Sequence, residues 1–329
     1  MILALWTVCF LSTLAVILGY GVRQKAIVVR RLEQKNKLSL IAEAGIEKAI
    51  AELTRQAQEP KAYLSLQDSL CNDPPAFQRV TVGEGSFSVY YHYIDEESGQ
   101  AQTIYGLRDE ESKININQAD LAVLKSIFTQ ALGYAESQAE ELAAAVIDWR
   151  DADSASATPS SGAENPYYHS LSFPYDAKDA AFEVPDELFL VKGFTQQVIE
   201  NLKDYITIYG SGKVNINTAS AVVLRALGLS PGLVSKILAF RKGTDKILGT
   251  SDDNIFAAAL DIVPKLTAYY NNMSVAETEE LNIAAEQYLV VNSSIFMISS
   301  FAQLNSGRSN AEVICVADRE GRIFYWHES

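Results

Sequence analysis

The pattern of apolar and polar residues begins with a run that carries no charge. Residues 1–22, MILALWTVCFLSTLAVILGYGV, contain no charged side chain. As a helix this run would extend about 33 Å, enough to cross the roughly 30 Å hydrocarbon core of a bilayer. It is longer than the apolar region of a signal peptide, and no A-x-A cleavage site follows it. We therefore expect a retained membrane anchor over residues 1–22.

A second helical pattern continues from this run without a break. No proline occurs before Pro60, and apolar residues recur at three- and four-residue spacing. The pattern predicts one continuous helix of about 55 residues that projects out of the bilayer. Its outer half carries an apolar stripe, for which we predict contact with partner helices; packing on the protein's own sheet is the alternative, and one helix can do both on different faces. The stripe consists of Leu38, Ile41, Ala42, Ile46, Ala49 and Leu53.

Period-two alternation predicts strands on both sides of a helical region. Residues 86–93 alternate between apolar and polar, and the turn sequence DEESGQ follows, which predicts a β-hairpin. Three short strand candidates close the chain, the last two joined by the turn REG. The fold class is α+β, with a long N-terminal helix, an antiparallel sheet and a large inserted α-helical domain. The expected divisions are 1–22, 23–112, 113–275 (the inserted domain) and 276–329 (the strands that complete the sheet).

One sequence element occurs twice in the helical region. KININQADLAVL at 113–124 and KVNINTASAVVL at 213–224 share seven of twelve positions. We expect Asn117 and Asn217 to cap the helices that follow, because an asparagine side chain accepts a bond from an unpaired N–H of the first turn. A turn that contains glycine and a second helix come next in each copy. The pattern resembles the helix-hairpin-helix element of DNA-binding proteins.

Charge argues against DNA as the partner of this element. The chain has 41 acidic and 27 basic residues, a net charge of −14. Residues 213–242 contain five basic and no acidic side chains, whereas 113–153 contain three basic and seven acidic ones. Both copies together would place a negatively charged hairpin near phosphates, which is unfavourable. A structural or protein-contact role is favoured, and the basic side chains of 213–242 have no assigned task.

An ordered set of short motifs resembles a known family. AEAGIEKAI, KININ, DWRDAD, GAENPYY, ELFLVKG and KVNINTAS occur in this order. The set is similar to the minor pseudopilin K family (GspK) of type II secretion systems. The resemblance covers nearly the whole chain. It implies a type IV pilin-like fold with an N-terminal membrane helix, a pilin-like sheet and the inserted α-domain.

The resemblance also implies a location. Pilin-like proteins begin with a short basic leader, but this chain starts at Met1 within the apolar run, so either the start given is short or processing differs. Members of the K family lack an acidic residue near the start of the helix, as does the run here. The positive-inside tendency would put Arg23, Lys25, Arg30 and Arg31 in the cytoplasm. The resemblance instead implies a single-pass inner-membrane protein with its body in the periplasm.

Two loops carry clustered carboxylates that suit Ca²⁺, a hard cation with six to eight oxygen ligands. DWRDAD and the loop after it supply the first set: Asp148, Asp151, Asp153 and Glu164. GTDKILGTSDDNIF supplies the second: Asp245, Asp252, Asp253 and Asn254. The alternative is a solvated acidic loop. The resemblance, in which the inserted domain holds Ca²⁺, favours the metal. Neither loop contains His or Cys, which disfavours zinc.

The sequence does not favour an enzyme. Its three histidines stand in no recognisable nucleophile arrangement, and no phosphate-binding glycine motif occurs. Cys71 and Cys315 could form one disulfide in an oxidising compartment or stay as two buried thiols.

The resemblance implies a function in protein export. The subunit would sit at the tip of the type II secretion pseudopilus with minor pseudopilins I and J, where it would initiate assembly and cap the fibre. It would touch other pseudopilins and could contact the secretin or cargo, with no nucleic acid expected. Two alternatives stay open: a membrane-anchored DNA-uptake receptor that uses the helix-hairpin-helix elements, and a minor pilin of a type IV pilus.

Overall fold

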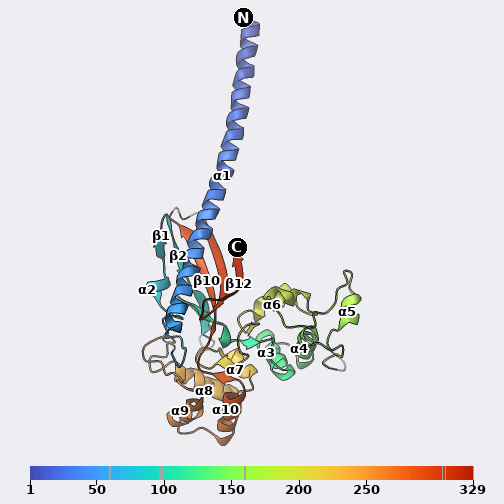
Figure 1. The fold of residues 1–329 in the computed structure, drawn as a ribbon, viewed down its shortest axis with the longest axis vertical. Coiled ribbons are helices and arrows are strands. Elements are labelled where there is room, and N and C mark those ends of the chain that lie inside the picture. Colours follow the sequence, from blue (N-terminus) through green and yellow to red (C-terminus); the bar gives the residue numbers. More distant parts are fainter. Residues whose placement is uncertain (59–60, 96–98, 159–160, 306, 308, 329) are drawn as a thin grey trace.

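Helix α1 (Ile2–Ala57) runs through the apolar run into the body without a break (Figure 1). The structure is a computed structural model that describes residues 1–58, 61–95, 99–158, 161–305, 307 and 309–328. Within that part of the chain, α1 is the one helix that is long and apolar enough to cross a membrane. Its first 37 residues contain no buried position, so the N-terminal part of the helix stands clear of the body.

The C-terminal half of α1 packs on one face of a six-stranded antiparallel sheet. The sheet order is β1-β2-β10-β11-β12, with β5 also paired to β10. Strands from both ends of the chain therefore meet, which confirms the mixed α and β class with a long N-terminal helix. The strands are β1 (Val80–Val82), β2 (Gly85–Val89), β5 (Arg108–Asp109), β10 (Ile295–Leu304), β11 (Asn310–Asp318) and β12 (Ile323–Glu328).

The apolar stripe of α1 is not free for partners, and the prediction of a partner-helix surface there was wrong. All six side chains are at most 6% exposed and lie in the core between α1 and the sheet. The sheet buries them because Phe87, Ile298 and Cys315 supply an apolar face at the same level of the helix. The stripe is Leu38, Ile41, Ala42, Ile46, Ala49 and Leu53.

The alternating stretch 85–95 splits between two sheets. Strand β2 ends at Val89, and β3 (Tyr91–Asp95) pairs with β4 (Gln100–Ile104) as a separate hairpin. Residues 96–98 of the expected turn lie outside the described residues. Short helix α2 (Pro74–Phe77) precedes the first strand.

The helical region between β5 and β10 consists of two units of similar plan. In the first, β6 (Ile114–Asn115) pairs in parallel with β7 (Ile206–Thr207); in the second, β8 (Val214–Asn215) pairs in parallel with β9 (Leu289–Val290). Helices lie between the two strands of each unit. The first unit holds α3 (Leu121–Leu132), α4 (Glu136–Arg150), α5 (Asn165–His169), η2 (Pro185–Leu190) and α6 (Gln196–Leu202). The second holds α7 (Ala221–Ala226), α8 (Pro231–Arg241), η3 (Ala259–Asp261), α9 (Ile262–Tyr269) and α10 (Val275–Gln287).

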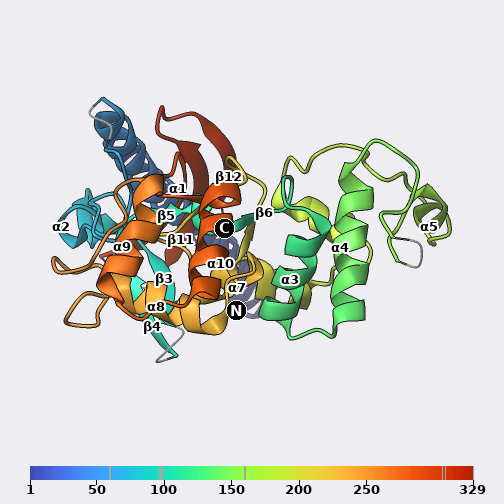
Figure 2. The ribbon, with the colours of Figure 1, turned by 90° about the horizontal axis from the view of Figure 1, so that it is seen from below.

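The two units share one core and lie at different places relative to α1. Helices α7–α10 lie beyond the C-terminal end of α1, whereas α3–α5 lie to one side (Figures 1 and 2). Helix α10 and β9 bury Leu281, Ala284 and Leu289 in this helical core. The final strands of the sheet therefore begin at Ile295, and residues 276–290, which we expected to belong with them, complete the helical region.

The asparagines of the repeat do not cap the helices, contrary to our expectation. Asp120 and Ser220 hold the cap positions, and their side chains accept from the backbone N–H of Val123 and Val223. Each helix starts three residues later than we expected, so Asn117 and Asn217 fall in the turn before it. There each makes a pair of bonds to one residue far along the chain.

The basic residues of 213–242 form no shared free surface. Lys236 forms an ion pair with Glu277 at 2.6 Å, and Lys213 donates to the carbonyl of Glu286. Arg241 is 2% exposed and donates to the carbonyl of Ala219. Arg225 donates to Gln130 on α3. Lys213, Lys236 and Arg241 thus make contacts within the second unit, and Arg225 joins it to the first.

Both internal cysteines are buried free thiols. Cys71 and Cys315 are each 0% exposed and unpaired. Burial raises the pKa of Cys71 well above its usual value and that of Cys315 to about 12, so both stay protonated.

Candidate metal centre

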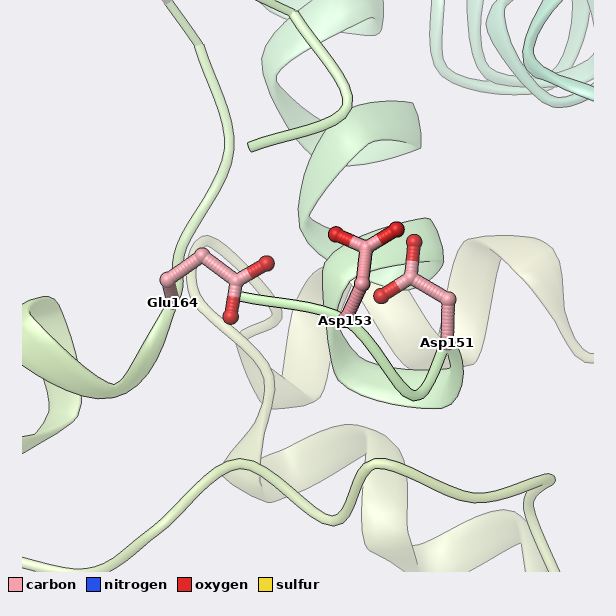
Figure 3. A group of neighbouring side chains, drawn as sticks. All are labelled: Asp151, Asp153 and Glu164. Atoms are coloured by element: carbon pink, nitrogen blue, oxygen red, sulfur yellow. The ribbon is translucent and has the colours of Figure 1, made fainter. Parts of the chain in front are cut away.

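Three carboxylates converge where α4 ends. Asp151 is the C-cap of α4, Asp153 follows in the bend, and Glu164 precedes α5. One oxygen of each lies within 4.8 Å of the other two, and Figure 3 shows the carboxyl groups turned toward a common space. Their number and chemistry match part of the oxygen shell that Ca²⁺ prefers.

Three oxygens of this group are buried without a partner among the described residues. They are Oδ1 of Asp151 and both carboxylate oxygens of Glu164, which is 8% exposed. Burial, followed by the charges of Asp153 and Asp148, raises the pKa of Asp151. Burial, followed by Asp148 and Asp151, likewise raises the pKa of Glu164. A divalent cation would supply both the missing contacts and the missing charge, so the residues present fit such an ion.

Asp148 holds the loop that carries this site in place. Its side chain is 0% exposed, and its two oxygens accept from the backbone N–H of Ala157 and Ala163, each at 2.7 Å. Gly162 passes so close that a Cβ there would lie 2.1 Å from Oδ2 of Asp148, at φ +117°. Only glycine tolerates that backbone and that approach. Of the four residues predicted for the first site, the structure brings Asp151, Asp153 and Glu164 together and leaves Asp148 as a brace for the loop.

The second predicted site has a different character. Asp245, Asp252 and Asp253 each offer an oxygen within 4.8 Å of the others. Oδ2 of Asp252, however, accepts from the N–H groups of Thr244 and Asp245 and from the Thr244 hydroxyl. Bonds from Thr244 and Thr250 hold the pKa of Asp252 well below its usual range. The hydrogen-bonding capacity of the Asp252 carboxylate is thus already used by groups of its own loop.

Two further observations separate this loop from the first. Asn254 donates to the carbonyl of Phe240 at the end of α8 and lies outside the group of three. Gln67 donates to the carbonyl of Asp253 from the segment that joins α1 to the sheet. The loop is therefore bound to the body of the protein by ordinary hydrogen bonds. Both loops nevertheless follow the second helix of their unit.

A family model described as "Type II secretion system (T2SS), protein K" matches residues 104–211, which include α3, α4 and the first carboxylate group. The type II secretion system protein K of Aeromonas hydrophila is 29% identical over 196 residues. That match covers 56% of this chain and 53% of the relative, so the chain spans about half the length of the curated relative it matches.

This chain is similar to type II secretion system protein K, most clearly over residues 104–211. The resemblance seen in the sequence is thus confirmed. A solved structure, the GspK-GspI-GspJ complex from the type 2 secretion system of enterotoxigenic Escherichia coli, has a chain of the same fold. The TM-score is 0.65 at 16% identity, over 92% of this chain and 99% of that chain.

Sequence reasoning missed a buried acidic cluster where the helical region joins the sheet. This junction cluster is Asp109, Glu110 and Glu111, each at most 5% exposed. Glu110 accepts from Thr207 and pairs with buried Lys113, and Glu111 accepts from the N–H of Ser211 and of Ser294. Three consecutive acids suggest a solvated turn, and the two-residue strand β5 is too short to show an alternating pattern that would indicate burial.

Proposed function

We propose that this protein is a minor pseudopilin that joins the minor pseudopilins I and J and caps the tip of a type II secretion pseudopilus. One observation carries the proposal: the second helical unit lies across the line of α1, beyond its C-terminal end (Figures 1 and 2). Subunits of such a fibre would stack along their long helices. A subunit whose helix axis is blocked at one end suits the last position and no other.

Partner contact would use the face of α1 that the sheet leaves open. Leu40 is 64% exposed and lies opposite the buried stripe, and Leu32, 57% exposed, lies beside this face, about 80° from Leu40 around the helix. Val29, 53% exposed, extends the same face toward the apolar run. A helix of I or J laid along this face would cover apolar side chains that otherwise meet water. The proposal gives the chain a structural role in export and no catalytic step.

Co-purification tests this assignment. We expect the fragment 24–329, which keeps every buried residue of both cores, to form a stable complex with soluble I and J fragments. Leu32→Gln with Leu40→Gln should weaken the complex at least tenfold, whereas Ile283→Gln, an exposed apolar residue on α10, should not. A fragment that elutes alone in the presence of I and J would contradict the proposal, as would a complex that the paired change leaves intact.

We further propose that Asp151, Asp153 and Glu164 hold Ca²⁺. The three unpartnered buried oxygens support it, and the ion would fix the loop that follows α4. Because the pKa values of Asp151 and Glu164 are raised, protons compete with the ion and affinity should fall as the pH drops.

Thermal unfolding with added calcium or a chelator measures this binding. Calcium should raise the midpoint of the fragment, and Glu164→Gln should remove most of the increase. Glu141→Gln, on the exposed side of α4, should leave it unchanged. If calcium still raises the unfolding midpoint of the Glu164→Gln variant, the ion binds at another site, and the second loop would be tested next.

For location we propose the inner membrane, with α1 as a single span and the body in the periplasm. The apolar N-terminal part of α1 supports the span. The similarity to a secretion-system protein supports the periplasmic side for the body.

A further inference from the structure

Four basic side chains surround α1 where it leaves the apolar run. We call Arg23, Lys25, Arg30 and Arg31 the basic collar. All four are exposed, and their side chains make no ion pair or hydrogen bond with any described part of the chain. At 100° per residue they point to several sides of the helix rather than to one. Neither the body nor the proposed helix partners account for them.

Charge is strongly divided between this stretch and the body. Residues 23–37 contain six basic side chains and one acidic side chain, a net +5. Residues 1–22 are uncharged and the whole chain carries −14, so residues 38–329 carry −19. A negatively charged surface would attract the first stretch and repel the second.

The position of the collar along the rigid helix makes such a surface available. Arg30 lies eight residues past Val22, which is about 12 Å of helix. Arg30 lines one cleft with Lys37, the turn at Gly83–Glu84 and Asn305, so the body begins at this end of the collar. The collar therefore occupies the space between the bilayer and the body. Arg23 and Lys25 lie within about 5 Å of the end of the apolar run and Arg30 and Arg31 at about 12–14 Å. The collar therefore spans the headgroup layer and the screening length of about 8–10 Å beyond it.

We propose that the basic collar binds anionic phospholipid headgroups of the leaflet from which α1 emerges. Lys and Arg side chains next to a bilayer are attracted by the negative surface potential of anionic lipids. The same leaflet repels the acidic body, so attraction at the collar and repulsion beyond it together hold α1 upright and the body away from the membrane. The proposal rests on α1 spanning a bilayer.

Lipid selectivity of the full chain tests the collar. The chain is reconstituted in phosphatidylcholine vesicles with a minor fraction of phosphatidylglycerol, and spin-labelled lipids report the relative association constant of the two headgroups. We expect a preference for phosphatidylglycerol that falls about fivefold in a variant with all four collar residues changed to Gln, and that weakens in high salt.

The matched control removes four positive charges from the body instead. Lys48, Arg79, Lys246 and Lys265 are exposed, and changing them to Gln should leave the preference intact. If the collar variant and the unchanged chain prefer phosphatidylglycerol equally, the proposed lipid binding by the collar is wrong. The membrane span would still stand, and a protein partner would be the ligand to test for these charges. A chain that carbonate strips from the vesicles would overturn the membrane span, and the collar with it.

Discussion

Asp109 is the most constrained ionisable side chain at the junction of sheet and helices. It is 3% exposed, and its Oδ2 accepts from the hydroxyls of Thr218 at 2.5 Å and Ser293 at 2.7 Å and from the amide of Asn215 at 3.0 Å. Burial raises the pKa of Asp109 to about 6 although these bonds oppose the rise. One carboxyl group thereby ties β5 to both ends of the second helical unit.

Stability should depend on pH through this group. Unfolded aspartate has a pKa of about 3.9, so between about pH 4 and 6 the folded state binds the proton more tightly. The stabilisation is complete below that window and is lost as the pH rises through about 6. The free energy of unfolding should fall by up to about 3 kcal/mol across it, and Asp109→Asn should flatten the fall.

Urea unfolding of the fragment 24–329 between pH 4 and 7.5, in chelator, measures this slope. Asp186→Asn changes an exposed carboxyl group of η2 and should keep the original slope. An unchanged slope in the Asp109 variant would mean that hydrogen bonding outweighs burial and that Asp109 is ionised throughout.

At the scale of elements, each helical unit is closed by one asparagine. Oδ1 and Nδ2 of Asn117 bond to the N–H and the carbonyl of Phe182, at 2.8 and 3.0 Å. Asn217 bonds to Phe256 in the same way, at 2.9 and 3.0 Å. Each residue therefore fastens the chain that returns from a carboxylate loop to the start of its unit. Arg150 and Arg241 add to this by bonding to the carbonyls of Ala119 and Ala219.

The two asparagines should differ in their energetic weight. Both also donate to a second carbonyl, that of Ile208 for Asn117 and that of Val291 for Asn217. They differ in burial, because Asn217 is 3% exposed whereas Asn117 is half-buried. Loss of the side chain leaves buried backbone groups unpaired, so Asn217→Ala should lower the free energy of unfolding by about 2–4 kcal/mol and Asn117→Ala by less.

Urea unfolding of the fragment gives both values, with the exposed Asn201→Ala on α6 as the control. If both repeat variants stay within the range of the control, the bonds to Phe182 and Phe256 do not hold the units closed.

The repeat shows what a pattern can predict about elements. Seven shared positions correctly indicated two related structures, because both copies start with a short strand and a helix. The pattern could not assign the cap, since Asn117 and Asp120 are equally suited to it. The path of the backbone decides between them, and that path depends on Phe182, 65 residues away.

At the scale of the molecule, composition predicted the order of parts better than their contacts. The uncharged run and the absence of proline before residue 60 were enough to predict α1. The carboxylates of Asp151 and Asp153 come together because they are two residues apart, which the sequence displays. The face of α1 that the sheet covers is decided by packing against strands more than a hundred residues away. The inward direction of Asp148 is decided by its bonds to the loop that follows α4. No periodicity carries that information.

The pairing of β2 with β10 has a consequence for biogenesis. Phe87 pairs with Ala302, so 214 intervening residues must be synthesised before the sheet can close. Until then the stripe of α1 has no cover, while the helical units, whose contacts are more local, can already fold. Long-range pairing of this kind slows folding and leaves apolar surface open to aggregation. The stripe of α1 is therefore the apolar surface that a nascent chain leaves uncovered longest, until β10 and β11 have been synthesised.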